Sequence, residues 1–207
     1  MRLAFSQAKA ALIILVLLSA VLAWLYPLLV LVPLLLLAFI FFFYRDPKRT
    51  APEDEQVILA PADGTVTRVA SADCDYVGDG SCQISIFMSP FSVHVNRSPI
   101  AGVVESVSHQ TGKFLPAMNP EAPLVNEKRS YCIRGAAIKV KVVQIAGIMA
   151  RRTVNWVFQD QEVVQGGKIG MIKLGSCTQV TFPANYKVLV AEGDKVQAGM
   201  TIIGRVN

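Results

Sequence analysis

The segment IKVKVV, at residues 138–143, alternates apolar and polar side chains, which is the two-residue period of a β-strand with one buried face. Beyond residue 44, no stretch of about 12 residues shows a helical repeat instead. The sequence therefore predicts a mainly β domain over residues 45–207, built as a sandwich or a partly open barrel. Similar short segments, rich in β-branched residues and separated by Gly, Pro, Asn or Asp, are QISIFM (83–88), GVVESVSH (102–109), TVNWVF (153–158), TQVTF (178–182) and YKVLV (186–190).

Two segments of this region share a pattern of a Gly turn, alternating apolar residues and a second Gly turn. They are ADGTVTRVA at residues 62–70 and EGDKVQAGMTIIGRV at residues 192–206. The pattern resembles biotinyl- and lipoyl-carrier domains, but this chain has no lysine on a tight hairpin that could be modified. The resemblance implies a barrel-sandwich-like single domain and does not imply a carrier function.

The N-terminal part of the chain is strongly apolar. Residues 10–44 contain no charged side chain, and Lys9 and Arg45 bracket the run. One straight helix of that length would measure about 50 Å, against roughly 30 Å of bilayer hydrocarbon, and Tyr26-Pro27 interrupts it near its middle. We therefore predict that residues 1–44 form a membrane-anchoring hydrophobic α-hairpin with spans at 10–25 and 28–43. A shallow re-entrant hairpin and a single kinked span stay open as alternatives.

Charge places the chain relative to the membrane. Lys and Arg total 20 against 15 Asp and Glu, a formal net charge of +5. The excess does not form a basic stripe with interleaved aromatics, so no nucleic-acid partner is predicted. Positive residues on both flanks of the apolar run favour an inner (plasma) membrane protein with its domain on the cytoplasmic side. Three of them are expected to face anionic lipid headgroups: Arg45, Lys48 and Arg49.

Few residues of the domain can carry chemistry. The four cysteines form no CxxC pair and have no His at ligand spacing, so neither a metal site nor a disulfide framework is predicted. His94 and His109 are the two histidines, and a lone His in a β segment is usually a hydrogen-bonded structural residue. Asp63 lies in an Asp-Gly turn signal, and Gly175-Ser176 would ordinarily be a bend between strands.

Taken together and in order, these residues lie in blocks that carry a specific resemblance. The chain resembles the phosphatidylserine decarboxylase family, in its short membrane-anchored bacterial and archaeal form. The similarity covers residues 44–207 and is preceded by a hydrophobic N-terminus of the expected kind. The ordered blocks are YRDP, PADG, SPFSVHVNRSPIAG, GKFLPA followed by NEK, IAGIMARR, and GGKIGMIKLGS.

The resemblance implies a proenzyme that cuts itself between Gly175 and Ser176. In the family the serine attacks the preceding peptide carbonyl, and the roles of base and orienting carboxylate would fall to His94 and Asp63. The cut would leave Ser176 as an N-terminal pyruvoyl group and two associated chains, residues 1–175 and 176–207.

The pyruvoyl carbonyl would serve as the electron sink for decarboxylation, so neither a metal nor pyridoxal phosphate is implied. The implied reaction converts phosphatidylserine to phosphatidylethanolamine at the membrane. Two alternatives stay open: decarboxylation of an archaeal ether-lipid serine (archaetidylserine), and a non-enzymatic membrane-tethered adaptor in which LGS is only a bend. The oligomeric state, including a homo-oligomer, is left open.

Two residues depart from the family pattern. Longer members have a second histidine three positions before the conserved one, where this chain has Phe91; water or His109 are then the candidates for protonating the product. Cys177 follows the serine and is either a small residue tolerated in a strand or a competing thiol nucleophile. The remaining candidate substrate-binding residues could meet the lipid phosphate: Arg151 and Arg152.

Overall fold

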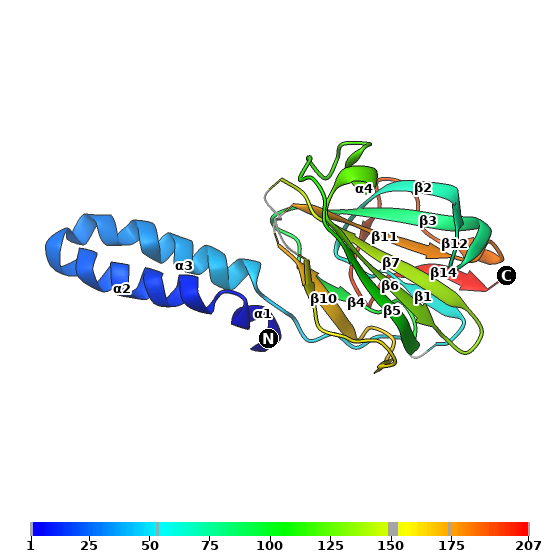
Figure 1. Ribbon diagram of the computed structural model, residues 1–207. Helices are drawn as coiled ribbons and strands as arrows, with labels where there is room; N and C mark the ends of the chain where they lie inside the picture. Colours follow the sequence, from blue (N-terminus) through cyan, green and yellow to red (C-terminus); the bar gives the residue numbers. More distant parts are fainter. Residues whose placement is uncertain (1, 53, 149–152, 174, 207) are drawn as a thin grey trace. The chain divides into compact units, whose positions relative to one another are not determined.

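The computed structural model describes the chain except residues 1, 53, 149–152, 174 and 207. It separates into two compact units, residues 1–48 and residues 49–207. The second unit is built almost entirely of antiparallel strands, so the predicted mainly β, barrel-like fold is confirmed (Figure 1). The boundary falls four residues beyond the predicted one at 44.

The N-terminal unit is a helical hairpin, as predicted. Its two longer helices, α2 and α3, contact each other and are separated by a break at Tyr26, which leaves helical geometry with φ −144° and ψ 79°. Pro27 follows, where its fixed φ and missing N–H suit the first position of a new helix. Among the helices described, none is both long and apolar enough to cross a membrane. The elements are α1 (Arg2–Ser6), α2 (Lys9–Leu25), η1 (Pro27–Val30) and α3 (Leu31–Phe43).

A curled eight-stranded antiparallel sheet dominates the second unit. Its order is β13-β2-β3-β11-β7-β6-β5-β9, so neighbours in the sheet come from both ends of the sequence. Register shifts interrupt the pairing of β2 with β3 and of β5 with β6, and such bulges increase local twist and help the sheet to curl. The strands are β2 (Gly64–Cys74), β3 (Gly78–Met88), β5 (Gly102–Gln110), β6 (Lys128–Arg134), β7 (Lys139–Ile145), β9 (Glu162–Val163), β11 (Ser176–Phe182) and β13 (Lys195–Val196).

Two three-stranded sheets complete the fold. One has the order β1-β14-β12 and the other β4-β10-β8. A single short helix, α4 (Ala122–Val125), lies in the long connection between β5 and β6. The strands are β1 (Val57–Leu59), β14 (Ile202–Val206), β12 (Tyr186–Val188), β4 (Val95–Arg97), β10 (Lys168–Ile172) and β8 (Thr153–Asn155).

The core lies between the layers and follows the alternation of the strands. Ile84 and Ile86 of β3 and Val140 and Val142 of β7 are fully buried, which is what the two-residue period in their segments predicts. Two predicted strands are shorter than expected, and one of them, the segment 186–190, is a strand only through Val188. The segment 153–158 is extended only through Asn155, because the Asn155 side chain accepts a hydrogen bond from Val157 N and donates one to Val157 O, which turns the chain.

The register defines one end of the large sheet. Ser176, the first residue of β11, pairs with Met88, the last residue of β3. Cys177 pairs with Ile145 at the end of β7. Ile145 in turn pairs with Lys128, and Lys128 with Gln110, across β6 and β5. We call this end of the strands the Ser176 end. Four loops leave the sheet here, in the parts that the structure describes: those after β3, β5 and β7 and the one before β11 (Figure 1).

Candidate functional site

Ser176 is held rigidly at the Ser176 end. Its strand is hydrogen-bonded along both edges, to β3 and to β7, and its side chain is fully buried. The hydroxyl Oγ donates to Met88 Sδ at 3.5 Å, a weak hydrogen bond to a thioether. A serine so placed has a fixed backbone, little access to water and a hydroxyl that can exchange its partner at low cost.

The carbonyl before Ser176 is also placed closely. Gly175 has φ +63°, in the left-handed region that favours glycine. Its carbonyl oxygen lies against Gly147, where an added Cβ would be only 2.0 Å from that oxygen. That Cβ would also lie 3.4 Å from Ala117 Cβ. The close approach explains why position 147 is a glycine, and it ties the Gly175 carbonyl to the loop after β7.

His94 lies just before β4 and is fully buried. Its backbone carbonyl accepts a hydrogen bond from Ile172 N at 3.2 Å, which extends the β4–β10 pairing to the end of β10. In the ring, Nδ1 is 2.9 Å from Ser92 O. A carbonyl oxygen can only accept, so Nδ1 carries the hydrogen; a neutral ring then has its lone pair on the buried Nε2. This is the tautomer that a general base requires.

A buried chain of hydrogen bonds connects the His94 strand to the Ser176 strand. Asn96 Nδ2 donates to Thr178 Oγ1 at 3.2 Å, and Asn96 Oδ1 accepts from Gln144 Nε2 at 2.7 Å. Tyr131 completes the chain by donating its hydroxyl to Gln144 Oε1 at 3.1 Å. Alternate residues of an extended chain share a face, so His94 lies on the Asn96 side of its strand and Ser176 on the Thr178 side of β11.

The hydroxyl and the imidazole are therefore brought into the same end of the fold, but they are not hydrogen-bonded to each other. The hydroxyl of Ser176 contacts Met88, and the role of His94 as its base stays a prediction. Catalytic hydrogen bonds often form only in the reacting state, so this geometry is compatible with that role.

The carboxylate of Asp63 is bound to an arginine side chain and to a backbone N–H. It forms a two-pronged ion pair with Arg49, at 2.5 Å (Oδ1) and 2.7 Å (Oδ2), and accepts a hydrogen bond from Ala198 N at 2.7 Å. Arg49 also donates to Ala198 O at 2.8 Å. None of these contacts of Asp63 among the described residues involves His94. The Nδ1 atom of His94 is hydrogen-bonded to Ser92 O. The role of Asp63 in orienting His94 stays a prediction.

The environment of Arg49 differs from the one expected from the sequence. Arg49 was predicted to face lipid headgroups, but only 9% of its side chain is exposed and its guanidinium is bound to Asp63. The reason is that the planar guanidinium matches a carboxylate at both oxygens, and a partly buried aspartate requires such a partner.

The other predicted site residues lie around the same end. His109 is exposed on β5, with 38% of its side chain accessible and Nε2 3.3 Å from Glu127 Oε1. Phe91 lies in the loop after β3 and is 70% exposed. Neither makes a described contact with Ser176. The candidate phosphate-binding residues fall outside the part of the chain that the structure describes: Arg151 and Arg152.

The Cys177 thiol does not compete with the Ser176 hydroxyl as a nucleophile. Burial raises the pKa of the Cys177 thiol to about 12, opposed in part by a hydrogen bond with the backbone of Ile86. The thiol therefore stays protonated at neutral pH, and a thiol is a much weaker nucleophile than its thiolate. The structure favours the interpretation that Cys177 is a small residue packed in a strand.

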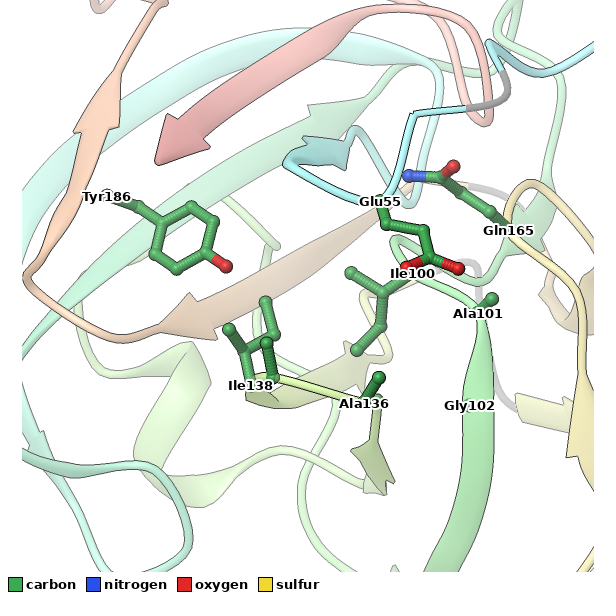
Figure 2. Close-up of a pocket in the computed structure, with 10 residues that line it drawn as sticks. Glu55, Ile100, Ala101, Gly102, Ala136, Ile138, Gln165 and Tyr186 are labelled. Atoms are coloured by element: carbon green, nitrogen blue, oxygen red, sulfur yellow. The ribbon is translucent and has the colours of Figure 1, made fainter. Parts of the chain in front are cut away.

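A cavity of about 220 Å³ lies at the opposite end of the sheet (Figure 2). Its wall includes Gly135 and Ile138, in the turn between β6 and β7, and Tyr186, beyond the end of β11. Ser176 begins β11 and Phe182 ends it, so the length of that strand separates the cavity from Ser176. Among the described residues, no group of three or more His, Cys, Asp or Glu side chains could hold a metal ion.

The fold and the site define a curled β-sheet protein with a buried serine behind a glycine carbonyl at the start of a central strand. A family model described as phosphatidylserine decarboxylase matches residues 36–204. The chain therefore belongs to the phosphatidylserine decarboxylase family, as the ordered sequence blocks predicted.

Curated relatives named phosphatidylserine decarboxylase proenzyme are similar over most of their length. One from Carboxydothermus hydrogenoformans is 46% identical over 174 residues, covering 83% of this chain and 82% of the relative. One from Chlorobium phaeobacteroides is 42% identical over 167 residues, covering 81% and 79%. One from Symbiobacterium thermophilum is 42% identical over 171 residues, again covering 81% and 79%.

Three features of the site were missed from the sequence. Gly147 lies in the quoted IAGIMARR block, but nothing in that block indicates which carbonyl it faces. Asn96 stands two residues after His94, and the two-residue period alone would have placed both on one face. Its link to Gln144 joins residues 48 positions apart, which no local pattern reveals.

The Arg49–Asp63 pair gives a test of stability. Replacing Arg49 with Met should lower the free energy of unfolding by about 3 kcal/mol, because a partly buried carboxylate is left without its partner. Arg205→Met is the matched control, since Arg205 pairs with Asp54 on the surface, with side chains 53% and 35% exposed. That change should cost less than about 1 kcal/mol. Chemical denaturation of the full chain, followed by the β-sheet circular dichroism signal, measures both; equal losses would contradict the interpretation of the buried pair.

Proposed function

We propose that this chain decarboxylates phosphatidylserine to phosphatidylethanolamine, using a pyruvoyl group that it makes from its own Ser176. The observation that carries the proposal is the arrangement at the start of β11. A fully buried serine follows a glycine at φ +63° whose carbonyl is packed against Gly147, inside a family whose relatives are named proenzymes.

The cut itself needs a nucleophile, an electrophile and a base. Ser176 Oγ would leave Met88 Sδ, lose its proton to His94 Nε2 and attack the Gly175 carbonyl carbon. The peptide C–N bond then breaks and an ester forms, while the proton returns to the Ser176 nitrogen. Loss of the Ser176 α-proton and cleavage of the Cβ–Oγ bond release the Gly175 carboxylate. Water converts the remaining dehydroalanine to pyruvoyl and ammonia.

The sheet accounts for how two chains would stay together after the cut. The small chain, residues 176–207, would contain β11, which is hydrogen-bonded on one edge to β3 and on the other to β7. It would also contain β14, which pairs with β1, and β13, which pairs with β2. Separation would break all these ladders and expose the core, so the cut chains stay associated.

The residues around Ser176 fit a small carbonyl group at its position. Ser176 begins its strand, so a new chain end there leaves the rest of β11 paired, and His94 stands in the adjoining layer as a buried acid or base. A pyruvoyl carbonyl supplies a sink for the electron pair left when the substrate loses CO2. Met88, Thr178 and the buried Asn96 exclude water from this space.

The apolar N-terminal unit supports membrane attachment of the chain. The exposed side chains of α2 and α3 include Ile13, Leu17 and Leu35, each more than half exposed, which suits a lipid environment rather than water. Lys9 and Arg45 flank the run at both ends, which supports a location at the inner (plasma) membrane with the β unit on the cytoplasmic side.

Site variants test the proposed roles. Ser176→Ala should give an uncut, inactive precursor because the attacking oxygen is gone. His94→Ala should slow cutting by about 10²–10⁴, the usual loss on removing a general base. Asp63→Asn should also slow cutting, because it removes the charge that would stabilise the imidazolium of His94 while nearly keeping the size of the side chain; prompt, complete cutting in this variant would overturn the orienting role of Asp63. Gel mobility reports cutting and released CO2 reports turnover. Prompt, complete cutting in His94→Ala would refute its assignment as base.

Gly147 provides a second test that leaves the reacting groups in place. Gly147→Ala should impair cutting, because its Cβ would lie 2.0 Å from the Gly175 oxygen and must displace the carbonyl. Gly204→Ala is the control, since its nearest heavy atoms lie at 3.3 Å, on the Phe182 ring at the other end of β11. We expect uncut precursor to accumulate in the first variant only, with folding checked by circular dichroism. Normal cutting in a folded Gly147→Ala chain would contradict the proposed placement of the carbonyl.

A further inference from the structure

Large apolar side chains are exposed in the loops that leave the sheet at the Ser176 end. Phe91 is 70% exposed in the loop after β3, and Ile148 is 55% exposed in the loop after β7. The connection between β5 and β6 carries three more: Phe114, Met118 and Leu124, at 37%, 62% and 73%. We call these five residues the rim. The other exposed large apolar residues described in this unit lie outside these loops: Phe158, Val164, Leu189, Met200 and Val206.

The longest of these loops is anchored from inside. The buried Asn126 accepts a hydrogen bond from Leu115 N at 2.8 Å and donates to Leu115 O at 2.9 Å and to Ala146 O at 2.8 Å. Lys113 and Asn126 also form a β-bridge. The backbone is therefore fixed while Met118 and Leu124 are held outward, so their exposure is a property of the folded loop.

The rim adjoins the proposed reaction centre. Ile148 follows Gly147, which packs against the Gly175 carbonyl, and Met118 follows Ala117, which faces the same glycine. Phe91 lies three residues after Met88, the partner of Ser176. These apolar groups thus come from loops whose neighbouring residues surround the position at which the chain would be cut.

The charges near the rim favour an anionic partner. Lys113 is exposed, and Lys128 and Lys173 are half-buried at the same end of the sheet. Of the two acidic groups in the β5–β6 connection, Glu127 is buried beside His109, and Glu121 is exposed. Apolar side chains with interspersed lysines match a surface that is apolar inside and anionic outside, as a bilayer containing anionic phospholipid is.

We propose that the rim is a docking surface for the lipid bilayer, distinct from the N-terminal hairpin as an anchor. The inference rests on the proposed function: Ser176 is fully buried, and the cost of lifting a lipid out of a bilayer rises with every CH2 exposed to water. The Ser176 end must then meet the bilayer, so that the headgroup enters while the acyl chains stay in lipid. Insertion of the rim into the bilayer makes this contact and removes the apolar side chains of the rim from water.

Tryptophan quenching by brominated lipid tests the contact in the full chain. The native Trp24 and Trp156 are first replaced by Phe, and a single Trp is placed at Leu124 or, as control, at Val164. The two sites are matched, with exposed fractions of 73% and 72%, but Val164 lies beside β9 and far from the Ser176 end. In anionic vesicles containing bromolipid, Leu124→Trp should be quenched and Val164→Trp should not. Equal quenching of Leu124→Trp and Val164→Trp, or no quenching of Leu124→Trp, would overturn the proposal that the rim docks on lipid. Absence of quenching at Leu124→Trp is also the result expected if another protein covers the rim.

A charged residue placed on the rim tests whether docking of the rim affects the turnover of phosphatidylserine in vesicles. Leu124→Asp should cut itself normally but raise the apparent KM for phosphatidylserine in vesicles about tenfold or more, since a carboxylate replaces an apolar side chain that would insert into the lipid. Its kcat on a short-chain, water-soluble phosphatidylserine should be unchanged. Val164→Asp should alter neither value, and an equal effect of both would overturn the proposal.

These readouts separate the two proposals. Rim quenching without decarboxylation of any serine lipid would refute the proposed function and leave the docking surface standing. Decarboxylation in vesicles without rim quenching would refute the docking surface and leave the proposed function standing.

Discussion

The pairing of β11 with strands on both of its edges is the constraint on which the site depends. Antiparallel ladders to β3 and β7 place Ser176 opposite Met88 and Cys177 opposite Ile145. A slip of one residue would turn every side chain of β11 to the other face and remove Ser176 from the buried layer. Because the ladders are long and internal, the serine can undergo a chemical change at the strand's first position without loss of the fold.

A second layer of polar contacts connects this strand to the one that carries His94. The chain from Tyr131 through Gln144 and Asn96 to Thr178 is fully buried, and each member is hydrogen-bonded. Such networks specify a single packing arrangement because a broken link leaves a polar group unsatisfied in the core. The small sheet, whose strand β4 directly follows His94, is thereby fixed against the large sheet that holds Ser176.

Local patterns predicted much of this molecule. The two-residue alternation located β3, β5, β7 and β11, and Tyr26-Pro27 located the break in the hairpin, since both are properties of short segments. The ordered blocks indicated the family. Contacts between distant residues could not be predicted. Arg49 binds Asp63 and Gly147 faces Gly175 only because the sheet brings separate segments together, and no local period encodes such pairs.

The central claim is that the chain cuts itself at one bond and turns the new end into its cofactor. The most direct test is the intact mass of the purified, denatured protein. The account predicts two chains, residues 1–175 ending in a free carboxylate and residues 176–207 beginning with a pyruvoyl group in place of Ser176. A single uncut chain of 207 residues with full decarboxylase activity would contradict it.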